Sequence, residues 1–206
     1  MVDKSYSEIT YSNIETPMIQ VYTGNGKGKT TAALGLAFRA AGHGYRVKIL
    51  QFMKCGTYSG ENISYIRLEP YISIEHFGRE CPKAISIAMG WSKCEGCGKC
   101  FIQKGNYLES DVEMANRGLL RAKEIMKNKE AELLVLDEIS NVIDCGILPV
   151  ESIVEILKER NRQIELVLTG RNMPKEITEL ADLVTEMNLI KHPYDKGISA
   201  RRGIEY

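Results

Sequence analysis

The chain has 206 residues, a length that suits one compact domain with a sizeable buried core. Its 27 lysines and arginines balance 27 aspartates and glutamates, so no overall field attracts it to nucleic acid or to anionic membranes. The apolar runs are far shorter than the roughly 20 residues needed to span a bilayer, and the polar N-terminus lacks the apolar core of a secretory signal. We therefore expect a cytoplasmic protein without nucleic-acid or membrane partners.

Short apolar segments alternate with helical patterns along the chain. In order, the sequence predicts an arm at 1–17, a strand at 18–24, a helix at 30–44, strands at 46–52 and 71–77, a helix at 109–128, a strand at 131–138, a helix at 150–160, a strand at 164–170, a helix at 174–181 and a strand at 182–187. Continuous apolar strands that alternate with helices are typical of a mostly parallel α/β sheet with helices on both faces. We expect a single domain over residues 1–206.

The composition changes at about residues 78–108, where Gly, Lys and Cys replace the apolar periodicity. We interpret this segment as an insert on the domain. It contains the run "WSKCEGCGKCF" (91–101), which places three cysteines at a spacing of three residues. Six cysteines in a cytosolic protein do not indicate a disulfide framework.

The stretch "TGNGKGKTT" lies between a predicted strand and a predicted helix, the context that makes a phosphate-binding loop credible. Its glycines allow backbone N–H groups to face an anion at the positive end of the helix. Lys29 would then reach phosphate oxygens, and Thr30 would offer its hydroxyl to Mg²⁺. The loop is one residue short of the common pattern, with Thr23 at the first glycine position. The alternative is a glycine-rich turn without a ligand.

Two further strand ends carry charged side chains. "LLVLDE" is an apolar strand that ends in Asp137 and Glu138, where a metal contact beside the loop belongs. If both residues are extended, they point to opposite sides, so only one meets the metal closely. "VLTGRN" places Arg171 after another strand, where its guanidinium suits either a polyphosphate or the surface.

The segments "VYTGNGKGKTTAALGLAFRAAGHGYRVKILQFMK", "LLVLDE", "VLTGRN", "LADLVTEM" and "KHPYDKGISARRGIEY" closely resemble the ATP:cob(I)alamin adenosyltransferases of the P-loop type. The resemblance covers residues 18–77 and 109–206. It implies a P-loop NTPase-like fold in which the cobalt(I) of a reduced corrinoid attacks C5′ of ATP and triphosphate leaves. Such a nucleophile carries no proton, so the reaction needs positioning and charge relief rather than a general base.

The resemblance also implies site residues, partners and a biosynthetic role. Lys29, Thr30 and Glu138 would be catalytic, with Thr30 and Glu138 binding Mg²⁺, while Arg39 and Arg171 would contact the nucleotide. The loop residues that would hold ATP are Gly24, Asn25, Gly26, Lys27, Gly28, Lys29, Thr30 and Thr31. A flavoprotein-type reductase, a homodimer and a role in adenosylcobalamin biosynthesis or salvage follow from the same resemblance, and the tail from Lys191 to Tyr206 would pack near the site.

The insert departs from the family, many of whose members carry a shorter, aromatic-containing stretch beside the corrin. The aromatic candidates for that part here are Phe77, Trp91, Phe101 and Tyr107. Sulfur ligands favour Zn²⁺ or an iron–sulfur cluster, and free or redox-sensing thiols are the remaining alternative. The predicted ligands are Cys81, Cys94, Cys97 and Cys100, with His76 in reserve, whereas Cys55 and Cys145 are interpreted as inert thiols.

Two other functions stay open at this point. An ordinary P-loop phosphotransferase or ATPase would direct attack at the γ-phosphate and release ADP. A metal- or redox-sensing ATP-binding module would use the cysteines as its working part and release neither ADP nor triphosphate. The products therefore distinguish the three functions.

Overall fold

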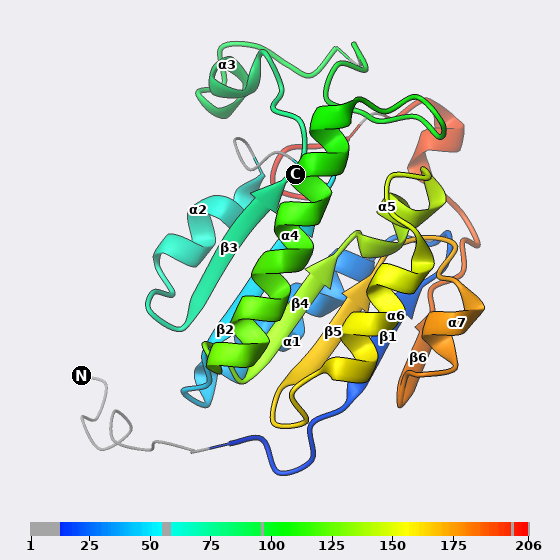
Figure 1. The fold of residues 1–206 in the computed structure, drawn as a ribbon. Helices are drawn as coiled ribbons and strands as arrows, with labels where there is room; N and C mark the ends of the chain where they lie inside the picture. The colour runs from blue at the N-terminus through cyan, green and yellow to red at the C-terminus, as the bar shows by residue number, and fades with distance from the viewer. Residues whose placement is uncertain (1–12, 55–58, 96, 199, 206) are drawn as a thin grey trace, which may run out of the picture.

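The computed structural model describes residues 13–54, 59–95, 97–198 and 200–205. Within these ranges, six parallel strands form a sheet in the order β3-β2-β4-β5-β1-β6 (Figure 1). The strands are β1 (Ile19–Thr23), β2 (Val47–Phe52), β3 (Ile72–Phe77), β4 (Leu133–Asp137), β5 (Glu165–Thr169) and β6 (Leu183–Glu186). The predicted strands and the parallel α/β fold are confirmed. Most of the predicted arm at 1–17 lies outside the described residues.

Helices flank the sheet on both sides. They are α1 (Lys29–Gly42), α2 (Gly60–Ile66), α3 (Ala84–Ala88), α4 (Glu109–Asn128), α5 (Ile139–Asp144), α6 (Val150–Glu159), α7 (Lys175–Thr178) and the 3₁₀ helix η2 (Pro193–Lys196). The four predicted helices correspond to α1, α4, α6 and α7, although α7 is shorter than the 174–181 expected. We did not predict α2, α3, α5 or η2. Each of them has at most seven residues, about two turns, which is too short to show a helical period. In the part of the chain with described structure, no helix combines the length and apolar character of a membrane span.

The core lies in two layers on opposite faces of the sheet. On one face, Ala33 and Ala37 of α1 pack against strand residues such as Val47, Ile49 and Val135. On the other face, α4, α5 and α6 cover the sheet, with fully buried side chains such as Ile125 and Ile153 (Figure 1). This double cover explains why the inner strands are apolar without alternation.

The sheet brings its strand ends together at one edge. Because all the strands are parallel, the carboxyl ends of β1, β2, β4 and β5 meet there. From β1 the chain passes over β5 and β4 to reach β2, whereas β6 lies on the other side of β1. The loop after β1 therefore lies at a point where the strand order changes direction. Ligands of open α/β sheets bind at such a point.

The predicted insert at 78–108 contains the short helix α3 and returns to the sheet at the start of α4. Asp111, in the first turn of α4, is buried and accepts a hydrogen bond of 2.7 Å from the backbone N–H of Leu108. Arg79, at the start of the insert, forms a two-pronged ion pair with the same carboxylate. The two ends of the insert are therefore joined by one ion pair.

This ion pair predicts a pH-dependent contribution to stability. The Arg79 guanidinium holds the pKa of Asp111 below its usual range, so the stabilisation is present above about pH 4 and is lost as pH falls through the folded-state pKa. We expect Asp111→Asn to lower the free energy of unfolding by about 1–3 kcal/mol at pH 7. In urea unfolding, the difference in free energy of unfolding between the wild type and Asp111→Asn should narrow below about pH 4. Glu113→Gln, on the exposed face of the same helix, should unfold with the same free energy as the wild type.

Candidate functional site

The loop between β1 and α1 is shaped by close contact with the chain after β6. Gly24 and Gly28 have positive φ angles of 96° and 119°. The N–H of Gly26 donates to the carbonyl oxygen of Met187 at 2.6 Å, and a Cβ on Gly26 would lie only 2.6 Å from that oxygen. Glycine is therefore required at positions 24 and 28 for the backbone conformation, and at position 26 for the close approach to Met187.

Gly26→Ala should consequently damage the loop, whereas Gly35→Ala offers a matched control. The added methyl group at position 26 meets backbone atoms that cannot move aside, but nothing lies within 4 Å at position 35 in the interior of α1. We expect the first change to weaken ATP binding by about tenfold or more and to destabilise the protein by about 1–3 kcal/mol. The second should stabilise it by about 0.5–1 kcal/mol. Calorimetric titration with ATP and urea unfolding measure both effects, and equal ATP affinity in the two variants would contradict this role of Gly26.

Lys29 lies at the centre of the loop. Its side chain is only 7 % exposed, and its ammonium group donates to the carbonyl oxygens of Gly24 and Gly26 at 2.8 Å each. Burial lowers the pKa of Lys29. The predicted phosphate-binding lysine is thus held among its own loop's carbonyl groups, next to the backbone N–H groups of the α1 N-terminus.

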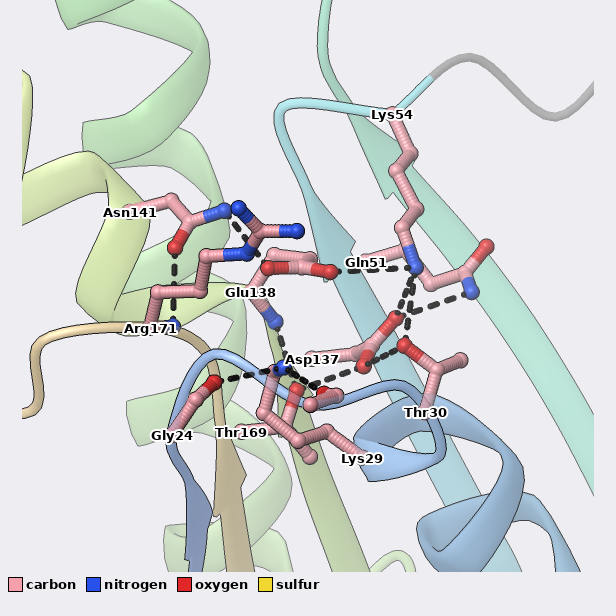
Figure 2. A network of polar contacts seen from close by, with 11 residues as sticks. Gly24, Lys29, Thr30, Gln51, Lys54, Asp137, Glu138, Asn141, Thr169 and Arg171 are labelled. Carbon is pink, nitrogen blue, oxygen red and sulfur yellow. Dashed lines mark hydrogen bonds and ion pairs between the residues drawn. The ribbon is translucent and has the colours of Figure 1, made fainter. Parts of the chain in front are cut away.

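A polar network centred on Asp137 follows the end of β4 (Figure 2). The Asp137 side chain is 1 % exposed and accepts hydrogen bonds from four side chains. Their donor distances are 2.9 Å for Thr30, 2.6 Å for Thr169, 3.1 Å for Gln51 and 2.7 Å for Lys54. One buried carboxylate is thus contacted by residues of α1, β2, β5 and the segment that follows β2. It holds in place the hydroxyl of Thr30, a predicted site residue.

Glu138 adopts a conformation that the sequence interpretation did not anticipate. The strand ends at Asp137, and Glu138 has a left-handed backbone with φ of 61°. The premise of two extended carboxylates on opposite sides was therefore wrong. Glu138 accepts a hydrogen bond of 2.6 Å from Asn141 and lies 3.7 Å from the Lys54 ammonium. Burial raises the pKa of Glu138.

Of the two ligands predicted for Mg²⁺, Thr30 donates a hydrogen bond of 2.9 Å to Asp137, and Glu138 accepts one of 2.6 Å from Asn141. Oxygens of Thr30, Asp137 and Glu138 nevertheless all face the same Lys54 ammonium. A hydroxyl and two carboxylates around one position suit a hard divalent cation. The residues present therefore fit Mg²⁺, and the assignment of Thr30 and Glu138 as its ligands stays a prediction.

The two predicted arginines lie in different places. The turn that carries Arg171 is fixed by hydrogen bonds from Ser140 to the Arg171 carbonyl at 2.6 Å and from the Arg171 N–H to Asn141 at 3.1 Å. Burial lowers the pKa of Lys29 and the nearby positive charge of Arg171 adds to this effect, so Arg171 faces the site. The same charge opposes the rise in the pKa of Glu138 that burial causes. Arg39 is exposed in the last turn of α1, ten residues from Lys29, which is about 15 Å along a helix. Its contact with the nucleotide stays a prediction.

The other loop residues and the tail form the outer part of the site. Asn25, Lys27 and Thr31 are exposed. An open pocket of about 560 Å³ is lined by Gly26 and Lys27 together with residues 188–193. Lys27 forms an ion pair of 2.7 Å with Glu205, and Arg202 donates to the carbonyl of Ala88 in α3 at 3.2 Å. The described part of the tail thus contacts the loop between β1 and α1, beside the candidate site as expected, and also contacts the insert, which was not predicted.

The cysteines that were predicted to bind a metal differ in their burial. Within the described ranges, no group of three or more His, Cys, Asp or Glu side chains is arranged to hold a metal ion. Cys81 is buried in a small apolar cluster, with Cys100 packed against it, whereas Cys94 and Cys97 are exposed. Cys145 is buried, in agreement with an inert thiol, and Cys55 lies outside the described residues.

Sequence reasoning missed three members of the Asp137 network: Gln51, Lys54 and Thr169. A weak signal existed, since each lies at or just after the carboxyl end of a predicted strand. In a parallel sheet these ends share one edge, and β2 and β5 turn out to flank β4 directly. The order of the strands, which the sequence did not reveal, was the missing information.

Together, the strand–loop–helix unit, the buried lysine and the carboxylate network define a nucleotide-binding P-loop protein of the α/β class. Residues 15–206 match the family model described as ATP:corrinoid adenosyltransferase BtuR/CobO/CobP. The chain belongs to this family.

Curated relatives agree with this membership. Corrinoid adenosyltransferase of Escherichia coli K12 is 33 % identical over 99 % of this chain and 93 % of its own length. Corrinoid adenosyltransferase of a Sinorhizobium species is 35 % identical over 93 % of this chain and 81 % of its own. Among solved structures, ATPases 2 and 3 of Geobacillus thermodenitrificans EssC are 12 % identical with a TM-score of 0.40, over 92 % of this chain and 35 % of that one.

Proposed function

We propose that this protein transfers the 5′-deoxyadenosyl group of ATP to the Co(I) of a reduced corrinoid, in the biosynthesis or salvage of adenosylcobalamin. The observation that carries the proposal is the buried Lys29 within the short glycine loop, next to the Thr30–Asp137 network, in a member of this family. In the reaction, a cobalt–carbon bond forms and the bond from C5′ to the triphosphate oxygen breaks. The electron pair of the broken bond leaves with triphosphate.

The protein's share of this reaction is to position two reactants and to relieve charge on the leaving group. The nucleophile brings its own electron pair, so no side chain needs to remove a proton. Lys29 and the backbone N–H groups at the N-terminus of α1 would contact the polyphosphate, and positive groups arranged in advance stabilise developing negative charge. Lys27 and Arg171 add positive charge at the rim.

Mg²⁺ would be held by Thr30 and Glu138, with Asp137 orienting the Thr30 hydroxyl. When bound, the ion would supply charge neutralisation on the triphosphate oxygens. The chain's own contribution is to keep these oxygens together: Asp137 accepts from Thr30 at 2.9 Å, and Asn141 holds Glu138 at 2.6 Å.

An anaerobic incubation with ATP, Mg²⁺ and chemically reduced cobalamin tests the function. We expect adenosylcobalamin and triphosphate in equal amounts, measured by the visible spectrum and by phosphate chromatography. ADP without adenosylcobalamin would support an ordinary phosphotransferase or ATPase instead. ATP binding without either product would support a sensing module.

We propose a metal-dependent role for the cysteine segment, with zinc as the first candidate and an iron–sulfur cluster as the second. Support comes from the spacing of Cys94, Cys97 and Cys100 and from the packing of Cys100 against Cys81. Binding would require the exposed Cys94 and Cys97 to move inward. Metal analysis and a visible spectrum of anaerobically purified protein test this role, and protein without metal or absorbance would refute it.

We further propose that one domain spans the chain and acts in the cytoplasm as a homodimer that receives electrons from a flavoprotein-type reductase. The resemblance to the family supports these points. Light scattering in solution tests the dimer, and cob(II)alamin supplied with a reduced flavoprotein tests the electron source.

A further inference from the structure

The ammonium group of Lys54 lies where three oxygens of the site converge (Figure 2). Its Nζ is 3.0 Å from the Thr30 hydroxyl and 2.7 Å from a carboxylate oxygen of Asp137. A carboxylate oxygen of Glu138 is 3.7 Å away. These are the same oxygens that fit Mg²⁺, so the ammonium and a metal ion cannot both occupy this position.

The backbone conformation before Lys54 directs its side chain toward Asp137. Met53 has a positive φ of 56°, which is uncommon for a residue other than glycine. Its N–H donates to the carbonyl of Phe77 at 2.9 Å. Opposite, a Cβ on Gly78 would lie 2.5 Å from the carbonyl carbon of Met53, so only glycine allows the two segments to approach this closely. The carboxyl ends of β2 and β3 thus hold Lys54 in a constrained turn toward Asp137.

The Lys54 ammonium also compensates part of the negative charge of Asp137 and Glu138. Asp137 is buried and the adjacent Glu138 is half-buried, and the Lys54 ammonium lies 2.7 Å from the first carboxylate and 3.7 Å from the second. Two such negative charges without a cation between them repel each other, and each is costly to desolvate. A cation is therefore needed here whether or not magnesium is bound.

We propose that Lys54 is a tethered cation that occupies the magnesium position in the nucleotide-free protein and is displaced when Mg²⁺ arrives with ATP. This inference rests on the proposed function for its assignment of the metal. It makes Lys54 a positioning residue, since the ammonium keeps Thr30, Asp137 and Glu138 arranged before the substrate binds. The site should then bind free divalent cations only weakly, because a metal ion without ATP must compete with an internal charge.

Mn²⁺ binding without nucleotide, followed by electron paramagnetic resonance, tests the proposal. We expect weak binding to the wild type and affinity greater by about tenfold or more for Lys54→Met, because the competing charge is gone. Lys54→Arg, which keeps the charge, should bind as weakly as the wild type. Lys48→Met, on strand β2 ahead of Lys54, is the matched control and should also bind weakly. Adding Glu138→Gln to Lys54→Met should reverse the gain, which would locate the ion between these oxygens.

Thermal unfolding supplies a second readout that a merely structural lysine would not change. Lys54→Met should melt at a lower temperature than the wild type in EDTA and should regain most of the difference in millimolar Mn²⁺. The wild type should respond little to Mn²⁺ alone. If Lys54→Met does not fold, Lys54→Gln removes the charge with a smaller change in polarity and should show the same gain in affinity.

Two outcomes would overturn the proposal: Mn²⁺ affinity unchanged by loss of the charge, or a loss of melting temperature that Mn²⁺ does not repair. Because no corrinoid is present, these outcomes are independent of the adenosyl transfer assay. If the wild type makes adenosylcobalamin but Lys54→Met binds Mn²⁺ no more tightly than the wild type, this inference alone is refuted. If Lys54→Met binds Mn²⁺ more tightly but the wild type makes no adenosylcobalamin, the proposed function alone is refuted.

Discussion

Lys29→Met is expected to lower the rate of adenosyl transfer by about 100- to 1,000-fold, the usual cost of removing one preorganised group that stabilises developing charge. The buried ammonium already lies inside the loop, 2.8 Å from the carbonyls of Gly24 and Gly26. A phosphate group that entered the loop would offer it stronger acceptors than these carbonyls. Methionine keeps the length of the side chain and removes the charge.

The same change should affect folding much less than the reaction. Burial lowers the pKa of Lys29, which means that the charged form is held at a cost in the nucleotide-free protein. Removing it leaves two carbonyls without this donor but also removes a desolvated charge. Urea unfolding should therefore show a loss of no more than about 1–3 kcal/mol. ATP affinity, measured by calorimetric titration, should fall clearly.

Lys27→Met is the control within the same loop. Lys27 is exposed and forms an ion pair with Glu205, an arrangement that contributes little to stability. We expect a decrease in rate of less than about tenfold, because a solvated charge is screened. If Lys29→Met transferred adenosyl groups at nearly the wild-type rate, ATP would not lie in this loop.

Much of this arrangement was predictable because its signals are local. The apolar runs that became β4 and β5 are buried along their whole length, and a strand buried on both faces is read directly from such a run. The loop that holds Lys29 follows from glycines between a strand and a helix. The resemblance of the tail to the family then placed it beside the site, where Glu205 contacts Lys27.

The parts that were missed depend on contacts between distant segments. Lys54 is a single lysine after a strand, and only the order β2-β4-β5 reveals that it meets Asp137 and Thr169 across the sheet edge. The relation of Asp137 to Glu138 was misjudged because the left-handed backbone of Glu138 has no marker in the sequence. For the cysteine segment, spacing alone did not predict that Cys94 would be exposed while Cys81 is buried.

Asp137→Asn is expected to destabilise the protein by roughly 3–5 kcal/mol, the cost of breaking a buried ion pair by removing one partner. All four groups that contact this carboxylate are donors, from Thr30, Gln51, Lys54 and Thr169. An asparagine amide would present two donors of its own to this set, and Lys54 would lose its closest counter-charge. Urea unfolding at pH 7 measures the loss.

The activity of Asp137→Asn should fall as well, because Thr30 would lose the acceptor that orients its hydroxyl. Asp144→Asn provides the matched control: Asp144 pairs with Lys104 at 3.0 Å, but the two side chains are 37 % and 74 % exposed. An exposed pair of this kind contributes at most about 1 kcal/mol. Equal losses of stability in the two variants would mean that the network around Asp137 does not act as a buried unit. A stable Asp137→Asn protein with full activity would remove Asp137 from the site altogether.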